Sequence, residues 1–186
     1  MQDKMLDSLS KWIAIVASIL ALAGGTGWYS EHVKSQREAQ EARERIIVDT
    51  LAPIELLLQT NEGIFKELRS SEYTESGWGI QESYLLKIRR DGTKKNSLMK
   101  QRIDTLVKNN QSIITLLQKY AGYTRTPDFP RESQAFVDHA SLYNDRWNSL
   151  IEIFESGGNF PTGAPVFPEG FPPALRAEIH ALKHDA

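Results

Sequence analysis

The chain has 186 residues, of which 40% are hydrophobic and 25% charged, and its net charge is −2. This length suits one domain of ordinary size with a short additional segment. Cysteine is absent, which excludes a disulfide framework, a thiolate metal site and a thiol nucleophile.

An uncharged stretch over residues 12–30 stands out near the N-terminus. As an α-helix it is ~27 Å long, close to the thickness of a bilayer's hydrocarbon core. Trp12 lies at one end and Trp28 with Tyr29 at the other, the placement typical of membrane–water interfaces. We therefore predict an N-terminal tail over residues 1–11 and a single transmembrane helix over residues 12–30.

Two other interpretations of this stretch remain open. A cleaved signal peptide would use Ala21-Leu22-Ala23 as its cleavage site, but Asp3 and Asp7 offset the basic start that such peptides carry. A buried core helix usually shows a polar face, and residues 12–30 show none. A retained membrane anchor is the interpretation that we favour.

Small residues recur along this segment, and they are Ala14, Ala17, Ser18, Ala21, Gly24 and Gly25. Such spacing lets two helix backbones approach closely in lipid. We expect these residues to pack against a second copy or another membrane helix. The alternative is that Ala and Gly are simply common in membrane helices.

Basic residues flank the anchor unequally. Two lysines precede it, and four basic residues follow closely, namely Lys34, Arg37, Arg43 and Arg45. This excess predicts a cytoplasmic soluble domain on a single-pass protein of the cell (inner) membrane. Helix-favouring residues with charges of both signs predict a helical stalk over residues 31–50.

Three seven-residue apolar repeats follow the stalk. They consist of Ile47, Leu51, Ile54, Leu58, Asn61, Phe65 and Leu68; Met99, Ile103, Leu106, Asn110, Ile113, Leu117 and Tyr120; and Phe136, Ala140, Tyr143, Trp147, Leu150 and Phe154. This spacing is typical of coiled coils and bundle helices. Pro53 predicts a kink or break near residues 50–53. Asn61 and Asn110 sit at seam positions, where a buried amide can set the register.

We therefore predict an all-α fold, in which a transmembrane helix precedes an antiparallel bundle of three long helices over residues 51–157. A short helix over residues 80–90 would pack as a fourth partner. Residues 158–186 would form a proline-rich extended segment and a short helix over residues 173–184. The apolar residues of that extended segment predict that it packs in a groove of its own bundle or of a partner.

A basic segment is the strongest candidate for binding. Residues 87–102 hold seven cations against one acid, and the cations are Lys87, Arg89, Arg90, Lys94, Lys95, Lys100 and Arg102. Such a segment suits an anionic lipid, nucleotide or protein face, and Trp78 in the preceding loop could add a ring contact. The alternative is a solvated turn, with Trp78 as a plug on the bundle. Nucleic acid is not expected, because charge alone does not specify it.

Residues typical of catalysis or metal binding form no recognisable motif. His180 and His184 are four residues apart, but two ligands near a chain end make a weak site, so we expect no metal and no cofactor. We expect a non-enzymatic, membrane-anchored interaction protein that binds another protein or itself as an assembly, scaffold or accessory subunit. The alternative is a sensor or effector whose basic segment binds an anionic ligand and alters membrane permeability.

Overall fold

The computed structural model describes residues 31–69, 79–91, 97–161 and 165–184, and within these ranges all regular structure is helical. The chain divides into two compact units, Met1–Glu44 and Arg45–Ala186. Residues 31–44, the described part of the first unit, are α-helical and largely exposed. Among the described residues, none of the helices has the length and apolar character needed to span a bilayer. The predicted transmembrane helix, residues 12–30, lies outside them.

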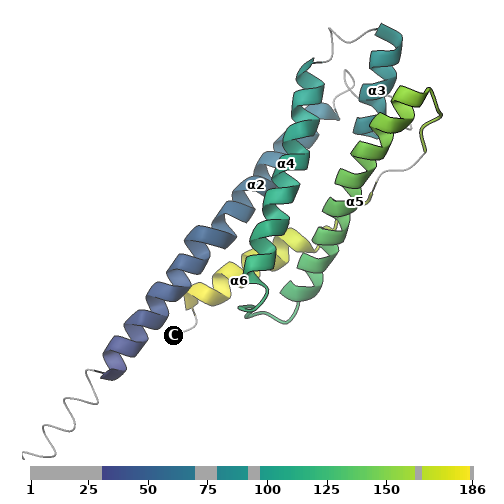
Figure 1. Cartoon of the computed structure of the whole chain (residues 1–186). Helices are drawn as coiled ribbons and strands as arrows, with labels where there is room; N and C mark the ends of the chain where they lie inside the picture. Colours follow the sequence, from purple (N-terminus) through teal and green to yellow (C-terminus); the bar gives the residue numbers. More distant parts are fainter. Residues whose placement is uncertain (1–30, 70–78, 92–96, 162–164, 185–186) are drawn as a thin grey trace, which may run out of the picture. The chain divides into compact units, whose positions relative to one another are not determined.

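The second unit is a helical bundle, which confirms the all-α prediction (Figure 1). Three long helices, α2 (Ala52–Leu68), α4 (Ser97–Tyr120) and α5 (Phe129–Ser156), run antiparallel to their neighbours. The short helix α3 (Ile80–Asp91) packs beside α5 at one end of the bundle. At the other end, α6 (Phe171–His184) packs against α5, α2 and a π-helical turn, η1 (Ile47–Leu51).

Near residues 50–53, where a kink or break was expected, the helix is not interrupted but widens into the π-helical turn η1. The amide of Ala52 donates to the carbonyl of Ile47, five residues earlier, at the end of η1. Pro53 then lies in the first turn of α2. Because proline has no amide hydrogen and its ring crowds the preceding turn, a locally wider turn relieves the conflict. Ile46 and Ile47 already pack on the core, so the bundle begins before residue 51.

The core consists of two hydrophobic clusters, one toward each end of the bundle. The first joins η1, the start of α2, the end of α4, the start of α5, and α6; its large members include Leu51, Ile113, Tyr120, Phe136 and Phe171. The second joins the end of α2, α3, the start of α4 and the end of α5; its members include Leu68, Tyr84, Met99, Trp147 and Phe160. All seven residues of the second repeat are buried, as a seam facing two neighbours requires.

A layer of asparagines lies between these clusters along the three long helices. Asn61 donates to Asn110 over 3.1 Å, and Asn109 donates back to Asn61 over 2.7 Å. Asn110 also donates to Asn144 over 3.4 Å, and Asn144 donates to the carbonyl of Val107. The predicted burial of Asn61 and Asn110 at seam positions is therefore confirmed. Their role in setting the register stays a prediction.

The described part of the proline-rich segment packs on its own bundle. We call residues 159–161 and 165–170 the strap. Phe160 is buried in the second cluster and Phe171, just after the strap, in the first. Between them, Phe167 contacts the ring of Phe136 edge-on, with centroids 6.2 Å apart. The strap therefore contacts its own bundle, while Val166 stays exposed; binding of the strap to a partner stays a prediction.

Candidate functional site

The described cations of the basic segment already have partners within the bundle. The guanidinium of Arg89 lies 5.1 Å from the ring centroid of Phe160 and 5.5 Å from that of Phe154. It also donates to the carbonyl of Gly158 over 3.4 Å. Arg89 therefore covers the aromatic edge of the second cluster, where its charge stays at the surface.

The cations at the start of α4 form ion pairs. The Lys100 amine donates to Asp104 over 2.6 Å, and this bond raises the pKa of Lys100. Arg102 Nε lies 3.1 Å from Glu67 Oε2 on α2. That nitrogen has no well-directed hydrogen bond, so the contact with Glu67 is an ion pair. Each pair cancels part of the positive potential that the sequence predicts here.

The remaining predicted site residues fall into two groups. Lys87 and Arg90 also make interactions within the structure. Lys94, Lys95 and Trp78 lie outside the described residues, as do all six residues predicted to pack in the membrane. The structure thus brings the described cations to one end of the bundle, on α3 and α4, without assembling them around a common ligand position.

Three consecutive polar residues at the start of α3 are buried, which the sequence did not indicate. Arg146 of α5 forms an ion pair with Glu82, whose Oε1 lies 2.7 Å from Nε and 2.6 Å from Nη2. Arg146 also donates to the carbonyl of Pro161. Gln81 donates to the carbonyl of Tyr143 over 3.2 Å. Ser83 is fully buried as well. Arg146 therefore ties α3 and the strap to α5.

A second buried carboxylate fixes α6. Glu178 has no exposed surface, and its Oε1 accepts hydrogen bonds from the Tyr120 hydroxyl and the Arg125 amide. Its Oε2 accepts from the amide and the hydroxyl of Thr126, the former over 2.7 Å. Burial, reinforced by Glu178, raises the pKa of the Tyr120 hydroxyl. A glutamate on the apolar stripe of this helix was the sequence signal for this contact.

His139 of α5 lies beneath the strap among aromatic rings. Ring centroids of Phe167, Tyr143 and Phe136 lie 5.5, 6.4 and 6.5 Å from its own. Its Nδ1 is buried without a hydrogen-bond partner. Burial lowers the pKa of His139, and a hydrogen bond with the backbone of Val166 opposes that shift. No carboxylate or hydroxyl contact of a catalytic kind accompanies this histidine among the interactions of the described residues.

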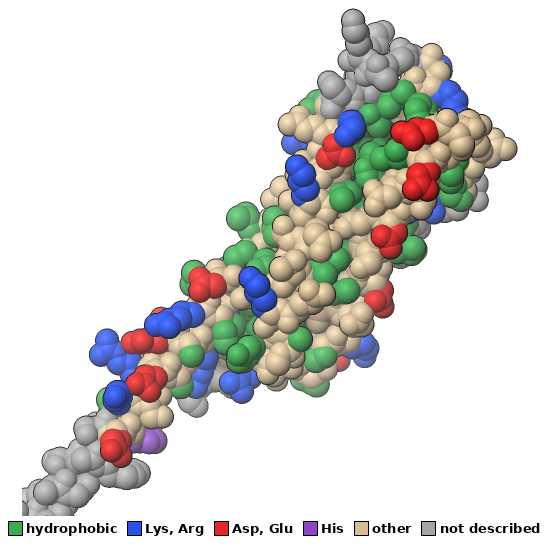
Figure 2. Space-filling model, in the orientation of Figure 1, with side chains coloured by type: hydrophobic (Ala, Val, Ile, Leu, Met, Phe, Trp, Pro, Cys, Tyr) green, Lys and Arg blue, Asp and Glu red, His purple; other side chains and the backbone are tan. Residues whose placement is uncertain are grey.

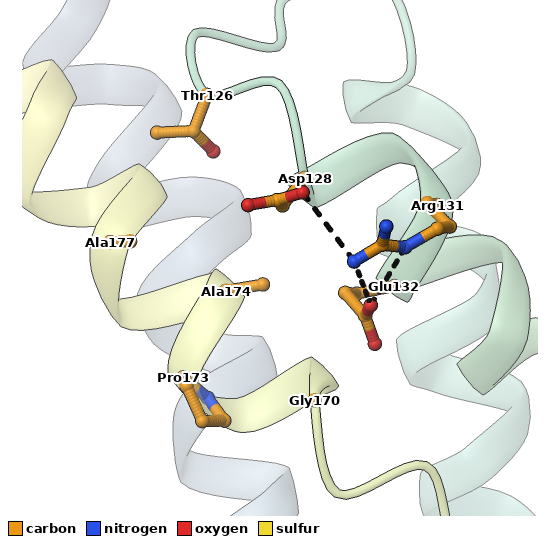
Figure 3. Close-up of a pocket in the computed structure, with 8 residues that line it drawn as sticks. All are labelled: Thr126, Asp128, Arg131, Glu132, Gly170, Pro173, Ala174 and Ala177. Atoms are coloured by element: carbon orange, nitrogen blue, oxygen red, sulfur yellow. Dashed lines mark hydrogen bonds and ion pairs between the residues drawn. The ribbon is translucent and has the colours of Figure 1, made fainter.

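A shallow pocket of about 330 Å³ opens between the starts of α5 and α6 (Figure 3). Its lining comprises Thr126, Asp128, Arg131, Glu132, Gly170, Pro173, Ala174 and Ala177. Arg131 pairs with Glu132 over 2.8 Å and with Asp128 over 3.4 Å, so the pocket's charges are largely satisfied by one another. A side chain at Gly170 would collide with the Glu132 carboxylate. The pocket offers no aligned nucleophile and base.

Metal-ligating side chains are not gathered at any point within the described ranges, where no group of three or more His, Asp or Glu could hold an ion. His180 and His184 do face one another, with ring centroids 4.2 Å apart. Both are exposed on α6. Within the part of the chain that the structure describes, no third ligand accompanies this pair.

The outer faces of the long helices differ in charge. One row, which we call the α2 outer row, consists of Val48 of η1 together with Ala52, Leu56, Gln59 and Gly63 of α2, all exposed and uncharged. Val48 and Leu56 are 65% and 64% exposed, and hydrophobic side chains project from this edge (Figure 2). The corresponding row on α5 holds Asp138, Leu142, Asp145, Ser149 and Glu152, and acidic side chains line that edge (Figure 2).

Comparison of the chain with models of known families, with curated proteins and with solved structures yields no significant match.

Proposed function

We propose that this chain is a single-pass membrane-anchored interaction protein, whose helical bundle serves as an assembly, scaffold or accessory subunit beside the membrane. The anchor is residues 12–30, the bundle lies on the cytoplasmic side, and its partner is a protein. Membrane lipid surrounds the anchor. The proposal is non-enzymatic and requires no cofactor.

The distribution of polar and apolar groups in the bundle is the observation that carries this proposal. Its two buried carboxylates, Glu82 and Glu178, are engaged in bonds that join separate parts of the bundle. Large apolar side chains, by contrast, stand on the outer faces, with Val48, Leu56 and Leu142 more than half exposed. A molecule whose buried carboxylates stabilise the fold and whose apolar side chains are exposed is better suited to binding a partner than to catalysis.

The test has two parts. Membranes containing the full chain are washed with alkaline carbonate, and a retained chain is expected because an uncharged segment of this length inserts stably. The chain is then purified in mild detergent and its mass is measured together with any bound protein. Release by carbonate, or a lone monomer without a partner, would contradict the proposal.

The alternative is an anionic-ligand sensor that acts through the basic segment. The contacts of Arg89, Lys100 and Arg102 favour it less, because each of these cations is engaged within the bundle. Anionic and neutral lipid vesicles distinguish the two. The sensor is favoured over the scaffold if the full chain binds its partner, or causes vesicle leakage, only with anionic lipid and Arg89→Ala/Lys100→Ala abolishes that effect.

A further inference from the structure

The α2 outer row forms an unpartnered ridge on the bundle. Its five residues follow the spacing four, four, three, four, so they lie along one side of the helix for ~22 Å. Ala52 is small, and a side chain added at Gly63 would meet nothing within 4 Å. Beside the row, the Thr60 hydroxyl donates to the carbonyl of Leu56, so it makes no demand for a bond from outside.

The absence of charge along this row matters for one particular partner. When two copies of a chain pair about a two-fold axis with their helices parallel, each residue on the contact line lies close to its own image. A charged residue there meets the same charge, which is unfavourable. Uncharged residues carry no such penalty. From Val48 to Gly63 the row satisfies this condition over four helical turns.

Charged residues interrupt the exposed faces of the other long helices. The outer row of α5 carries Asp138, Asp145 and Glu152, and each would face its own image in a parallel pair. The outer face of α4 carries Lys108 and Lys119. Between these lysines, Gln111, Thr115 and Gln118 are exposed and uncharged but polar, whereas the α2 outer row also exposes the large apolar side chains of Val48 and Leu56.

The order of the chain supplies the orientation. This step rests on the proposed function, in which residues 12–30 of every copy lie in the same membrane. The anchor precedes Val48 and α2 in the sequence of every copy, so the α2 helices of two anchored copies start on the same side of the same membrane. Small residues of the anchor, such as Ala17 and Ala21, favour the same close pairing within the lipid.

We infer that the partner of the α2 outer row is a second copy of this chain, bound in parallel about a two-fold axis through Val48, Ala52, Leu56 and Gly63. The membrane concentrates the copies and removes part of the entropy lost on association. Each copy then covers the apolar side chains that its own bundle leaves exposed. The remaining faces stay available to a different protein.

Single-cysteine crosslinking tests this arrangement directly, because the chain has no cysteine of its own. Val48→Cys, Leu56→Cys and Gly63→Cys are made separately in the full chain and oxidised in native membranes. A disulfide needs Cβ atoms within about 4.5 Å, so a parallel pair predicts a covalent dimer for each variant alone. Leu142→Cys is the matched control, since Leu142 is 57% exposed on α5, and it should stay monomeric.

The possible results separate clearly. Dimers that form only when Val48→Cys and Gly63→Cys are mixed would indicate antiparallel helices and overturn the inference. Equal crosslinking of Leu142→Cys would indicate random collision and overturn it too, as would no dimer at any α2 position. If these variants stay monomeric while the chain resists carbonate and co-purifies with another protein, the inference fails and the proposed function stands.

A charge placed on the row gives an independent readout. Leu56→Glu in the Val48→Cys background should reduce the crosslinked fraction at least fivefold, because two carboxylates would face one another. Leu142→Glu, at a similarly exposed position, should leave that fraction unchanged. Circular dichroism of both variants checks that the bundle remains folded. Undiminished crosslinking in a folded Leu56→Glu chain would contradict the inference.

Discussion

Removing the Glu178 carboxylate should loosen α6 from the bundle. This carboxylate is fully buried and accepts four hydrogen bonds, two of them from the backbone amides of Arg125 and Thr126. Those amides belong to the connection between α4 and α5, so Glu178 joins that connection to α6. Glu178→Ala takes away every acceptor at once, and Glu178→Gln keeps the shape but replaces one acceptor with a donor.

The expected magnitude follows from the groups left without partners. A buried donor that loses its acceptor costs about 1–3 kcal/mol. Glu178→Ala removes the acceptor of two amides and of the Thr126 hydroxyl, whereas the Tyr120 hydroxyl can still donate to the carbonyl of Tyr123. Some of these groups will reach water once α6 moves. We therefore expect a loss of about 3–5 kcal/mol in the free energy of unfolding for Glu178→Ala, and about 1–3 kcal/mol for Glu178→Gln.

Denaturant unfolding of the full chain in mild detergent, followed by circular dichroism, measures these changes. Hydrogen exchange of α6 amides adds a local readout, and protection should fall there before it falls in α4 or α5. Glu155→Ala, an exposed glutamate on α5, is the control and should change stability by less than ~0.5 kcal/mol. A Glu178→Ala protein that loses less than ~1 kcal/mol would refute the role assigned to this carboxylate.

Three further predictions concern other buried polar groups. Tyr143→Phe should keep or raise the unfolding free energy, by up to about 1 kcal/mol in denaturant melts, because the Tyr143 hydroxyl is buried without a partner. Asn110→Ala should cost about 1–3 kcal/mol, and the Asn61→Leu/Asn110→Leu double variant should not recover that loss, because Asn109 and Asn144 then lose their partners. Burial lowers the pKa of His139 below 6.5, so the folded bundle favours the neutral ring. The free energy of unfolding should therefore decrease as the pH drops below about 6.5. In denaturant melts from pH 7 to pH 5, this decrease should be smaller for His139→Phe.

The long helices could be predicted from the sequence because each carries a repeat of the helical period. In the repeat from Met99 to Tyr120, a seam residue occurs every three or four positions, and every one of these residues is buried. Period and burial are two expressions of the same geometry, since a helix with one apolar side must turn that side inward. The bundle's antiparallel arrangement follows from three such helices joined in sequence.

The polar contacts could not be predicted in the same way. Glu82 and Arg146 lie 64 positions apart, and nothing in their local sequence indicates that they pair. The strap is a similar case, because its apolar residues fit a groove of this chain as well as they fit a partner's. The contact of Phe160 with the second cluster can be seen only once the bundle is formed. Contacts distant in sequence depend on the whole arrangement of helices.

Long and short elements of this bundle are held by different means. α2, α4 and α5 interlock through extended apolar seams, whereas the shorter α3 and α6 each add a buried carboxylate, Glu82 and Glu178, that bonds to another part of the bundle. The short elements should therefore detach first when these bonds are weakened. The α2 outer row belongs to the long-helix framework and does not involve α6. Pairing through that row should consequently survive Glu178→Gln, while hydrogen exchange in α6 increases. A loss of Val48→Cys crosslinking in a folded Glu178→Gln chain would show that the pairing depends on the docking of α6.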